Sequence, residues 1–301
     1  MFQPKHGKTI KLFLMDADPE GRIVCELSNW TGKAYRIPRG KVKDCANREE
    51  LKGTAVYILF GRAESSSAKP RAYIGEAENV FNRLVQHVSE KEFWNEAVVF
   101  ISKDENLNKA HIKYLESRLH ELAVKAGRFQ IENGNTPTKS SISESDQAEM
   151  EEFIEYVRML INTLNFRVFE PLIRDGGDIN DSSDDLFLKG ARGANARGKR
   201  TTDGFVVFKD SEMATSTVPS FPRGFDTLRK ELLGGESIAP DGEKFVLRQD
   251  VLFSSPSAAA AVVMGRSANG LLEWKSASGK TLKEIESSEI EKANNAINAD
   301  A

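Results

Sequence analysis

Apolar and polar side chains alternate between residues 9 and 38, on both sides of the turn sequence Asp18-Pro19-Glu20-Gly21. Alternation with a period of two predicts strands with one buried face, and a turn of this composition between them predicts a hairpin. We therefore expect a small N-terminal β unit over residues 1–50.

The pattern changes several times after residue 53. Short apolar runs predict strands at 54–60, 72–75 and 97–101. Apolar residues at helical spacing follow Gly75, and a long helix is predicted from its cap residue Asn108 to Gly127. The predicted order is ββαβα. A further helix is expected at 145–165 and a strand at 166–173.

The strongest linker signal lies between residues 175 and 203. This segment lacks apolar periodicity and changes from an acidic to a basic half. Strands at 205–208 and 244–250, and a helix from Pro256 to Gly265, are expected after it. The expected order is a β unit at 1–50, an α+β unit with a helical extension at 53–170, a linker at 175–203, a smaller α+β domain at 204–284 and a frayed or disordered tail at 285–301.

Composition adds limits to this α+β organisation. The 301 residues are enough for two or three domains, and the net charge of -3 gives no general attraction for a polyanion, so a nucleic-acid surface has to be a local patch. The two cysteines, Cys25 and Cys45, lack metal-binding spacing. The first residues resemble neither a signal peptide nor a membrane span, so we expect a cytoplasmic protein with no membrane partner.

Several polar side chains in the first half can share one surface. Tyr57 and Tyr73 lie on the two predicted hairpin strands, and Arg83 and His87 are four residues apart on one helix. Glu116 falls within the apolar stripe of the long helix, where a carboxylate needs a partner such as a hard divalent cation. Each side chain also has an ordinary interpretation: strand packing for the tyrosines, and a solvated helix face for the others.

The order of these residues is more specific than any one of them. The strings AVYILFG, AYIGEAENVFNRLVQH and KYLESRLHELA resemble the GIY-YIG nuclease family over about 80 residues. The flanking strings PRGKV, NGNTPTK and FSSPSAAAAVVMGRSANGLLEWK resemble a bacterial subgroup that joins this nuclease domain to a C-terminal domain of unknown function.

The resemblance implies a metal-dependent endonuclease that hydrolyses phosphodiester bonds with one Mg²⁺ or Mn²⁺ ion. It implies that Tyr57 or Tyr73 deprotonates or orients the attacking water, with Tyr57 preferred, and that Arg83 stabilises phosphoryl charge. Glu116 would hold the metal, and His87 would contact the phosphate or relay a proton.

Three further positions follow from the same resemblance. Gly75 would let the backbone come close to a phosphate. The family adds an asparagine after the glutamate helix, for which Asn133 and Asn135 are both candidates. Glu76 departs from the family pattern, since some relatives have a cation there, and its charge would weaken the attraction for phosphate.

The second half offers candidate nucleic-acid contacts of a different kind. A basic, glycine-punctuated run can follow a phosphate backbone as a flexible arm or can be a solvated linker. Its cations are Lys189, Arg192, Arg197, Lys199 and Arg200. Nearer the C-terminus, Arg266 can meet a phosphate and Trp274 can stack on a base, although a tryptophan in this pattern is more typical of a core.

These observations lead to three functional hypotheses. The first is a metal-dependent endonuclease, acting on DNA, whose C-terminal domain helps to position the substrate. The second is a nucleic-acid-binding or regulatory protein on a nuclease fold with little turnover. The third, ranked last, is a thiol enzyme using Cys25 or Cys45. Cutting both strands would require a homodimer or two successive events.

Overall fold

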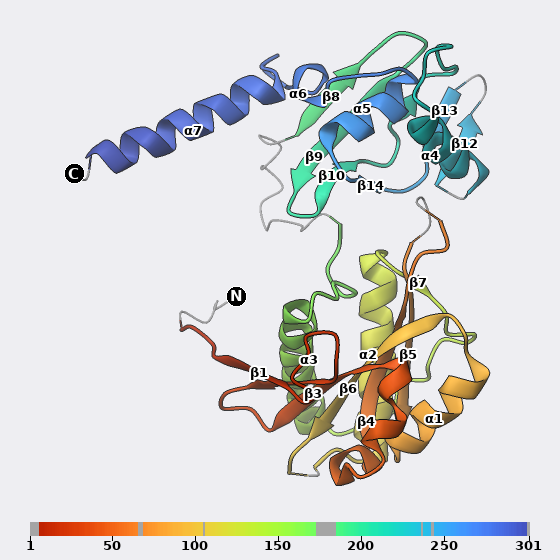
Figure 1. The fold of residues 1–301 in the computed structure, drawn as a ribbon, viewed down its shortest axis with the longest axis vertical. Coiled ribbons are helices and arrows are strands. Elements are labelled where there is room, and N and C mark those ends of the chain that lie inside the picture. The colour runs from red at the N-terminus through yellow and green to blue at the C-terminus, as the bar shows by residue number, and fades with distance from the viewer. Residues whose placement is uncertain are drawn as a thin grey trace. The chain divides into compact units, whose positions relative to one another are not determined.

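The chain folds into two compact units of α+β architecture, Met1–Pro171 and Leu172–Ala301. The structure is a computed structural model that describes residues 6–65, 69–104, 106–172, 185–235, 237–241 and 244–299. Each unit has its own sheet and its own buried apolar cluster (Figure 1). The expected pairing of a β-rich first half with a smaller second domain is confirmed.

The first unit is built on a seven-stranded sheet with the order β1-β2-β3-β6-β4-β5-β7. Its strands are β1 (Ile10–Leu14), β2 (Ile23–Leu27), β3 (Gly32–Pro38), β4 (Ala55–Gly61), β5 (Arg71–Ala77), β6 (Trp94–Ser102) and β7 (Gln130–Ile131). Neighbouring strands are antiparallel except β5 and β7, which pair in parallel through Arg71 and Ala72. The remaining residues of β5, from Tyr73 onward, form an edge of the sheet.

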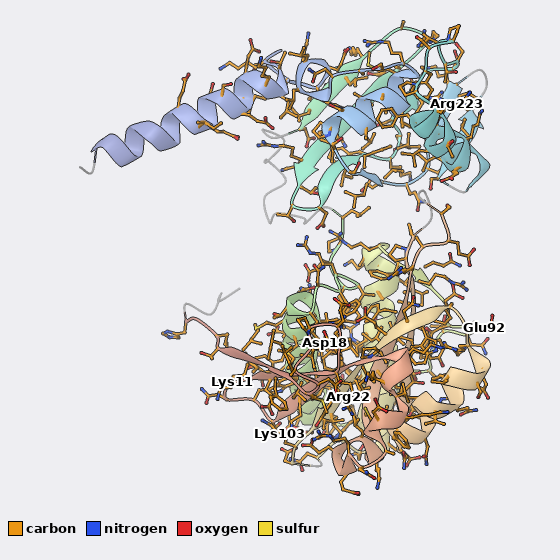
Figure 2. The ribbon with its side chains drawn as sticks, viewed as in Figure 1. Lys11, Asp18, Arg22, Glu92, Lys103 and Arg223 are labelled. Carbon is orange, nitrogen blue, oxygen red and sulfur yellow. The ribbon has the colours of Figure 1, made fainter. Side chains whose placement is uncertain are left out.

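The predicted N-terminal hairpin is present. The strands β1 and β2 pair in antiparallel register, and Asp18 accepts a hydrogen bond from the backbone N–H of Glu20 within the turn. Asp16 accepts two side-chain hydrogen bonds from Arg22, and these bonds stabilise the base of the turn. Arg22 and Asp18 of this hairpin are labelled in Figure 2. This hydrogen bonding holds the pKa of the Asp16 carboxyl well below its usual range.

The expectation of a separate β unit over residues 1–50 was wrong. β3 pairs along its whole length with β6, from Gly32 opposite Ser102 to Pro38 opposite Glu96. The hairpin therefore extends the same sheet as β4, β5 and β6, because β6 needs a partner on its second edge to satisfy its backbone groups.

Helices cover both faces of this sheet. α2 (Lys109–Ala126) and α3 (Glu144–Thr163) pack on one face, and α1 (Val80–Glu90) packs on the other (Figure 1). Alternate residues of β4 point to the two faces, so that Val56 joins the α2 side and Tyr57 joins the α1 side. The short 3₁₀ helices η1 (Arg39–Lys41), η2 (Lys43–Cys45) and η3 (Glu49–Lys52) precede β4.

The helix boundaries follow the predicted cap residues. Asn108 accepts hydrogen bonds from the backbone N–H groups of Ala110 and His111, and Gly127 ends α2 with a left-handed φ of 64°. The strand expected at 166–173 was wrong within the described residues, which reach Leu172. Asn165 turns the chain at a φ of 67°, and the apolar side chains that follow are buried in a turn.

The second unit contains an eight-stranded sheet in which β9 (Asn195–Thr201) has three partners. The other strands are β8 (Leu186–Lys189), β10 (Gly204–Val207), β11 (Glu212–Met213), β12 (Ile238–Asp241), β13 (Lys244–Leu247), β14 (Val251–Phe253) and β15 (Lys275–Ser276). The helices are α4 (Arg223–Gly234), α5 (Pro256–Met264), α6 (Gly270–Glu273) and α7 (Leu282–Ala299).

The predicted linker at 175–203 was therefore too long. Residues 186–189 and 195–201 are strands of the second sheet, and residues 175–184 of the candidate linker lie outside the described residues. The glycines hid these strands, since Gly198 carries no side chain at a position where a Cβ would meet the Val206 carbonyl oxygen at 2.5 Å. The expected tail, 285–301, is largely the helix α7.

Helix α5 forms the centre of the second core. Ser255 caps it by accepting a hydrogen bond from the Ala258 N–H, and every residue from Ala258 to Met264 is buried. Trp274 is buried beside Phe205, at 4.5 Å between ring centroids, so the interpretation of this tryptophan as a core residue is confirmed, and the alternative of base stacking does not hold. In the described part of the chain, no helix is both long and apolar enough to cross a membrane.

The extended boundary of the second unit has a measurable consequence. We expect a fragment of residues 185–301 to unfold cooperatively on heating, and a fragment of residues 204–301 to lack a cooperative transition. The shorter fragment loses β8 and β9, and with them one of the two strand partners of β10 and of β11 and the strand partner of β15. Circular dichroism melting curves of the two fragments test this, and a cooperative transition in the shorter fragment would contradict the strand assignment.

Candidate active site

The two candidate tyrosines lie on adjacent strands and on the same face of the first sheet. Tyr57 of β4 is opposite Gly75 of β5. Tyr73 of β5 is opposite Leu59, which lies next to Tyr57 on the same face of β4. The ring centroids of the two tyrosines are 6.3 Å apart. Tyr57 is fully buried and Tyr73 is half-buried. The sequence prediction that the two half-motifs meet is confirmed by this register.

Gly75 makes room for the Tyr57 side chain. A Cβ added at Gly75 would lie 2.4 Å from Tyr57 Oη and 2.5 Å from Cζ, closer than any atoms can approach without a shift. The tyrosine thus occupies the space at the Cβ position of Gly75, and the expectation that the Gly75 backbone comes close to a phosphate stays a prediction.

Helix α1 brings Arg83 and His87 to the Tyr57 hydroxyl. The helix begins at Asn79, whose side chain accepts a hydrogen bond from the Asn82 N–H. His87 Nε2 lies 2.8 Å from Tyr57 Oη, and Arg83 Nε donates to the same oxygen at 3.4 Å. His87 is completely buried, so the interpretation of these residues as a solvated helix face does not hold for the histidine.

The surroundings of His87 select its tautomer. Its Nδ1 is buried and has no hydrogen-bond partner among the described residues. A buried N–H without an acceptor is costly, so the proton is better placed on Nε2, where it is donated to Tyr57. Burial, and then the charges of Arg83 and Lys91, lower the pKa of His87 to about 4. A direct contact of His87 with a phosphate does not fit this buried position.

Tyr57 therefore has two donors directed at its oxygen. Burial raises the pKa of Tyr57, the nearby Tyr73 and Glu116 also raise it, and Arg83 acts in the opposite direction. Tyr73 has a different environment, because it is half-buried and the Lys91 ammonium group lies 4.5 Å from the centre of its ring.

Glu116 reaches the same region from the opposite face of the sheet. It lies on α2, which packs against the edge formed by the second half of β5. Its charge acts on Tyr57, and the Arg83 charge acts on Glu116. Within the described residues, its half-buried carboxylate has no hydrogen bond or ion pair. Burial and the negative charge of Glu76 raise the pKa of Glu116 to about 7.

Glu76, the departure from the family pattern, is also part of this edge. Lys109 Nζ lies 2.9 Å from the Glu76 carboxylate and 3.4 Å from that of Glu78. Lys109 thus neutralises part of the negative charge beside Glu116. The charges of Lys109 and Lys113 on α2 and of Arg83 on α1 act against the rise in the pKa of Glu116.

The carboxylates at this edge fit a metal ion that is bound by one or two carboxylates and by water. Over residues 6–172, apart from the undescribed positions 66–68 and 105, no group of three or more His, Cys, Asp or Glu side chains is arranged to hold a metal. A closed protein cage is thus ruled out for that part of the chain. An unpaired carboxylate near a second one suits Mg²⁺, which binds through one or two carboxylates and keeps several waters. Glu116 is the residue that would hold it.

The two candidate asparagines occupy different environments. The Asn133 side chain donates to the Ile74 carbonyl at 2.7 Å and accepts from the Ile74 N–H at 3.1 Å. It thereby continues the pairing of β7 along the edge of β5, next to Gly75. Asn135 is exposed. Asn133 positions the strand that carries Tyr73 and Gly75, which gives it the stronger structural link to the site.

The basic run of the second unit is not a flexible arm, contrary to one expectation. Arg192 donates to the carbonyl oxygen of Ser216 and to that of Met264, the last residue of α5. Arg200 forms ion pairs with Glu286 at 2.8 Å and Glu289 at 3.1 Å. Both arginines are committed to contacts within the unit. Lys189, Arg197 and Lys199 lie instead on strands β8 and β9.

Two cations near the tyrosines were missed by sequence reasoning. Lys91 follows His87 by four residues, and Lys109 precedes Glu116 by seven, so each shares a helix face with a recognised site residue. This spacing is the feature of the sequence from which the two lysines could have been found. The two cysteines are free and buried; burial raises the pKa of Cys25 to about 11 and also raises that of Cys45. Neither thiol has the environment of a nucleophile.

Comparison with known proteins gives a family for the second unit. Residues 186–286 match the family described as Domain of unknown function (DUF4357). This agrees with the expectation of a C-terminal domain of unknown function and with the strand β8 as its first element. No curated protein and no solved structure matches the chain. The function of the first unit is therefore argued from its motifs and geometry.

The contact between Gly75 and Tyr57 generates a prediction. We expect Gly75→Ala to lower the free energy of unfolding by about 1–3 kcal/mol, as overpacking in a core does, and to displace the Tyr57 ring. Gly134→Ala is the matched control, since a Cβ at Gly134 has no atom within 4 Å. Urea unfolding followed by fluorescence measures both. Equal stability of the two variants would show that the ring tolerates the added methyl group.

Proposed function

We propose that this protein is a metal-dependent endonuclease that hydrolyses phosphodiester bonds, with DNA as its expected substrate. The observation that carries the proposal is the convergence of Tyr57, Arg83, His87 and Glu116 at one edge of the first sheet. Phosphodiester hydrolysis requires a base for water, a cation for the phosphoryl oxygens and a metal ligand. These four side chains supply those groups.

Tyr57 acts as the base in this proposal. Its oxygen has donors on two sides, Arg83 Nε–H and the His87 Nε2–H favoured above. Tyr57 must first lose its own proton, which burial disfavours and the charge of Arg83 favours. The two donors then stabilise the phenolate, which accepts a proton from the attacking water. His87 is thus a positioning residue that stays neutral, which its lowered pKa supports.

Arg83 has a second role beside its bond to Tyr57. Its guanidinium is half-buried, carries a fixed charge and presents several donors, so it stabilises the charge that develops on the phosphoryl oxygens. A Mg²⁺ or Mn²⁺ ion held by Glu116 would add Lewis-acid stabilisation of the same oxygens.

A second function is favoured by one specific observation. Glu76, Glu78 and Glu116 give this edge more negative charge than Lys109 neutralises. Such an edge repels a phosphate backbone in the absence of a metal. This favours the alternative in which the protein binds nucleic acid on its nuclease fold and turns over little.

A plasmid nicking assay with Mg²⁺ or Mn²⁺ at fixed salt tests the proposed function. We expect the wild-type protein to nick supercoiled DNA. Tyr57→Phe removes the base and should lower the rate by about 10²–10⁴-fold, and Glu116→Ala should lower it at least as strongly.

Two variants serve as matched controls in the nicking assay. Tyr114→Phe removes a hydroxyl of α2 that donates to Glu151 of α3. Glu121→Ala removes a carboxylate of α2 that is bound to Arg118. Both should cut at nearly the wild-type rate. If the wild type leaves duplex, single-stranded and branched DNA and RNA intact but binds one of them, the alternative function replaces the nuclease.

The pKa of Glu116 predicts how metal binding depends on pH. The metal competes with a proton that leaves at about pH 7. The affinity for Mn²⁺ should therefore rise about tenfold per pH unit below pH 7 and level off above it. Electron paramagnetic resonance of free Mn²⁺ measures this without any catalytic readout.

Removing neighbouring charges should move this profile in a defined direction. Glu76→Gln removes the charge that raises the pKa of Glu116, so the pH above which the Mn²⁺ affinity stops rising should be lower. Glu116→Gln should abolish the dependence of the Mn²⁺ affinity on pH. Glu78→Gln is the matched control. An Mn²⁺ affinity that does not vary between pH 5 and pH 8 in the wild type would argue against Glu116 as the ligand.

A further inference from the structure

The second unit has one sheet face that its helices leave open. Leu186, Leu188, Ala196, Phe205 and Val207 point to the other face, where they are buried in the core with α5. Figure 1 shows α5 crossing the strands β9 and β10. Because side chains alternate along a strand, the residues between these core positions point to the opposite face.

A row of cations and aromatic rings crosses this open face. Phe187 of β8 is directly opposite Lys275 of β15 on one side and Arg197 of β9 on the other. The row continues to Phe208, whose N–H donates to the Arg197 carbonyl and whose ring lies 4.9 Å from the Arg197 guanidinium. Directly opposite residues on antiparallel strands share a face. The order is therefore Lys275, Phe187, Arg197, Phe208.

Three side chains of this row are accessible, and the fourth, Phe208, is buried with an exposed fraction of 8%. Phe187 is 38% exposed, whereas its chain neighbours Leu186 and Leu188 on the other face are 4% and 0% exposed. Lys275 and Arg197 are exposed as well. An exposed phenylalanine in the middle of a sheet face, with a cation on each side, contributes little to a core and is available to a ligand.

Neighbouring positions extend the positive character of this face. Lys189 lies on β8 opposite Asn195, and both are exposed. Among the residues that the structure describes, Asp185 is 3.7 Å from Arg197, and Glu212 is paired with Lys244. The charge of Lys275 also acts on Glu284, and Lys189 adds positive charge beyond these pairs.

We propose that this face, defined by Lys189, Phe187, Arg197 and Lys275, binds single-stranded nucleic acid. An aromatic ring offers a stacking platform to an unpaired base, and flanking cations contact the phosphates on either side. A duplex keeps its base faces stacked inside and cannot use Phe187. The inference deepens the proposed function by assigning a substrate-binding surface to the second unit. It rests on the proposed function only for the claim that the bound strand is then cut.

Fluorescence anisotropy with the full-length protein tests this surface. The probes are labelled 12-mers of dT and rU and a duplex of the same length, in buffer with EDTA so that nothing is cut. We expect Phe187→Ala to weaken binding of the single strand by about 5- to 100-fold, the usual effect of losing one stacked base, and Phe187→Trp to keep it. The two single strands show whether DNA or RNA is preferred.

Charge removal gives an independent measurement. The double variant Lys189→Gln and Lys275→Gln should reduce the slope of log affinity against log salt by about 1.4, since each phosphate contact to a single strand contributes about 0.7. Arg223→Gln on α4 and Leu272→Ala on α6 are matched controls for charge and for exposed apolar surface (Figure 2). Both should bind like the wild type.

The outcomes separate this proposal from the nuclease. Binding that is unchanged by Phe187→Ala and by the double lysine variant, or a duplex that binds as tightly as the single strand, overturns the proposal. A wild type that binds through Phe187 but cuts no substrate leaves this surface in place and removes only the nuclease. Circular dichroism of Phe187→Trp and Phe187→Ala shows that both remain folded.

Discussion

The candidate active site depends on the packing of one tyrosine side chain against one glycine. Tyr57 lies across Gly75 on the neighbouring strand, and no residue with a Cβ leaves that space open. This contact fixes the phenol oxygen where helix α1 can direct both Arg83 and His87 at it. Asn133 supports the arrangement from outside, because it binds both backbone groups of Ile74 at the unpaired edge.

The edge of β5 explains how groups on opposite faces of a sheet can act together. β7 pairs with only the first two residues of β5, so no described strand pairs with the rest of β5, where the Asn133 side chain binds the backbone of Ile74 instead. Tyr57 and Arg83 approach this edge from the α1 side, and Glu116 approaches it from the α2 side. The half-buried carboxylate of Glu116 retains a raised pKa there because Glu76 is close and no described side chain binds it.

The second unit uses its cations in two ways that the sequence does not separate. Arg192 donates a hydrogen bond to the end of α5, and Arg200 forms an ion pair with α7. Arg197, in contrast, lies on an open sheet face beside Phe187. All three belong to one basic run. A strand places alternate residues on opposite faces, so the positions of these arginines in the ladder decide which of them can meet a ligand.

The sequence alone determined the local helices and strands and indicated which residues belong to the candidate site. Alternation, helical spacing and cap residues such as Asn108 and Gly127 are short-range signals, and they gave the ββαβα order and the residues that gather around Tyr57. Tertiary structure decided the rest. The pairing of β3 with β6, the strands β8 and β9 within the candidate linker, and the burial of Trp274 depend on partners far along the chain. Periodicity carries no information about such partners, and glycines such as Gly198 weaken even the local signal.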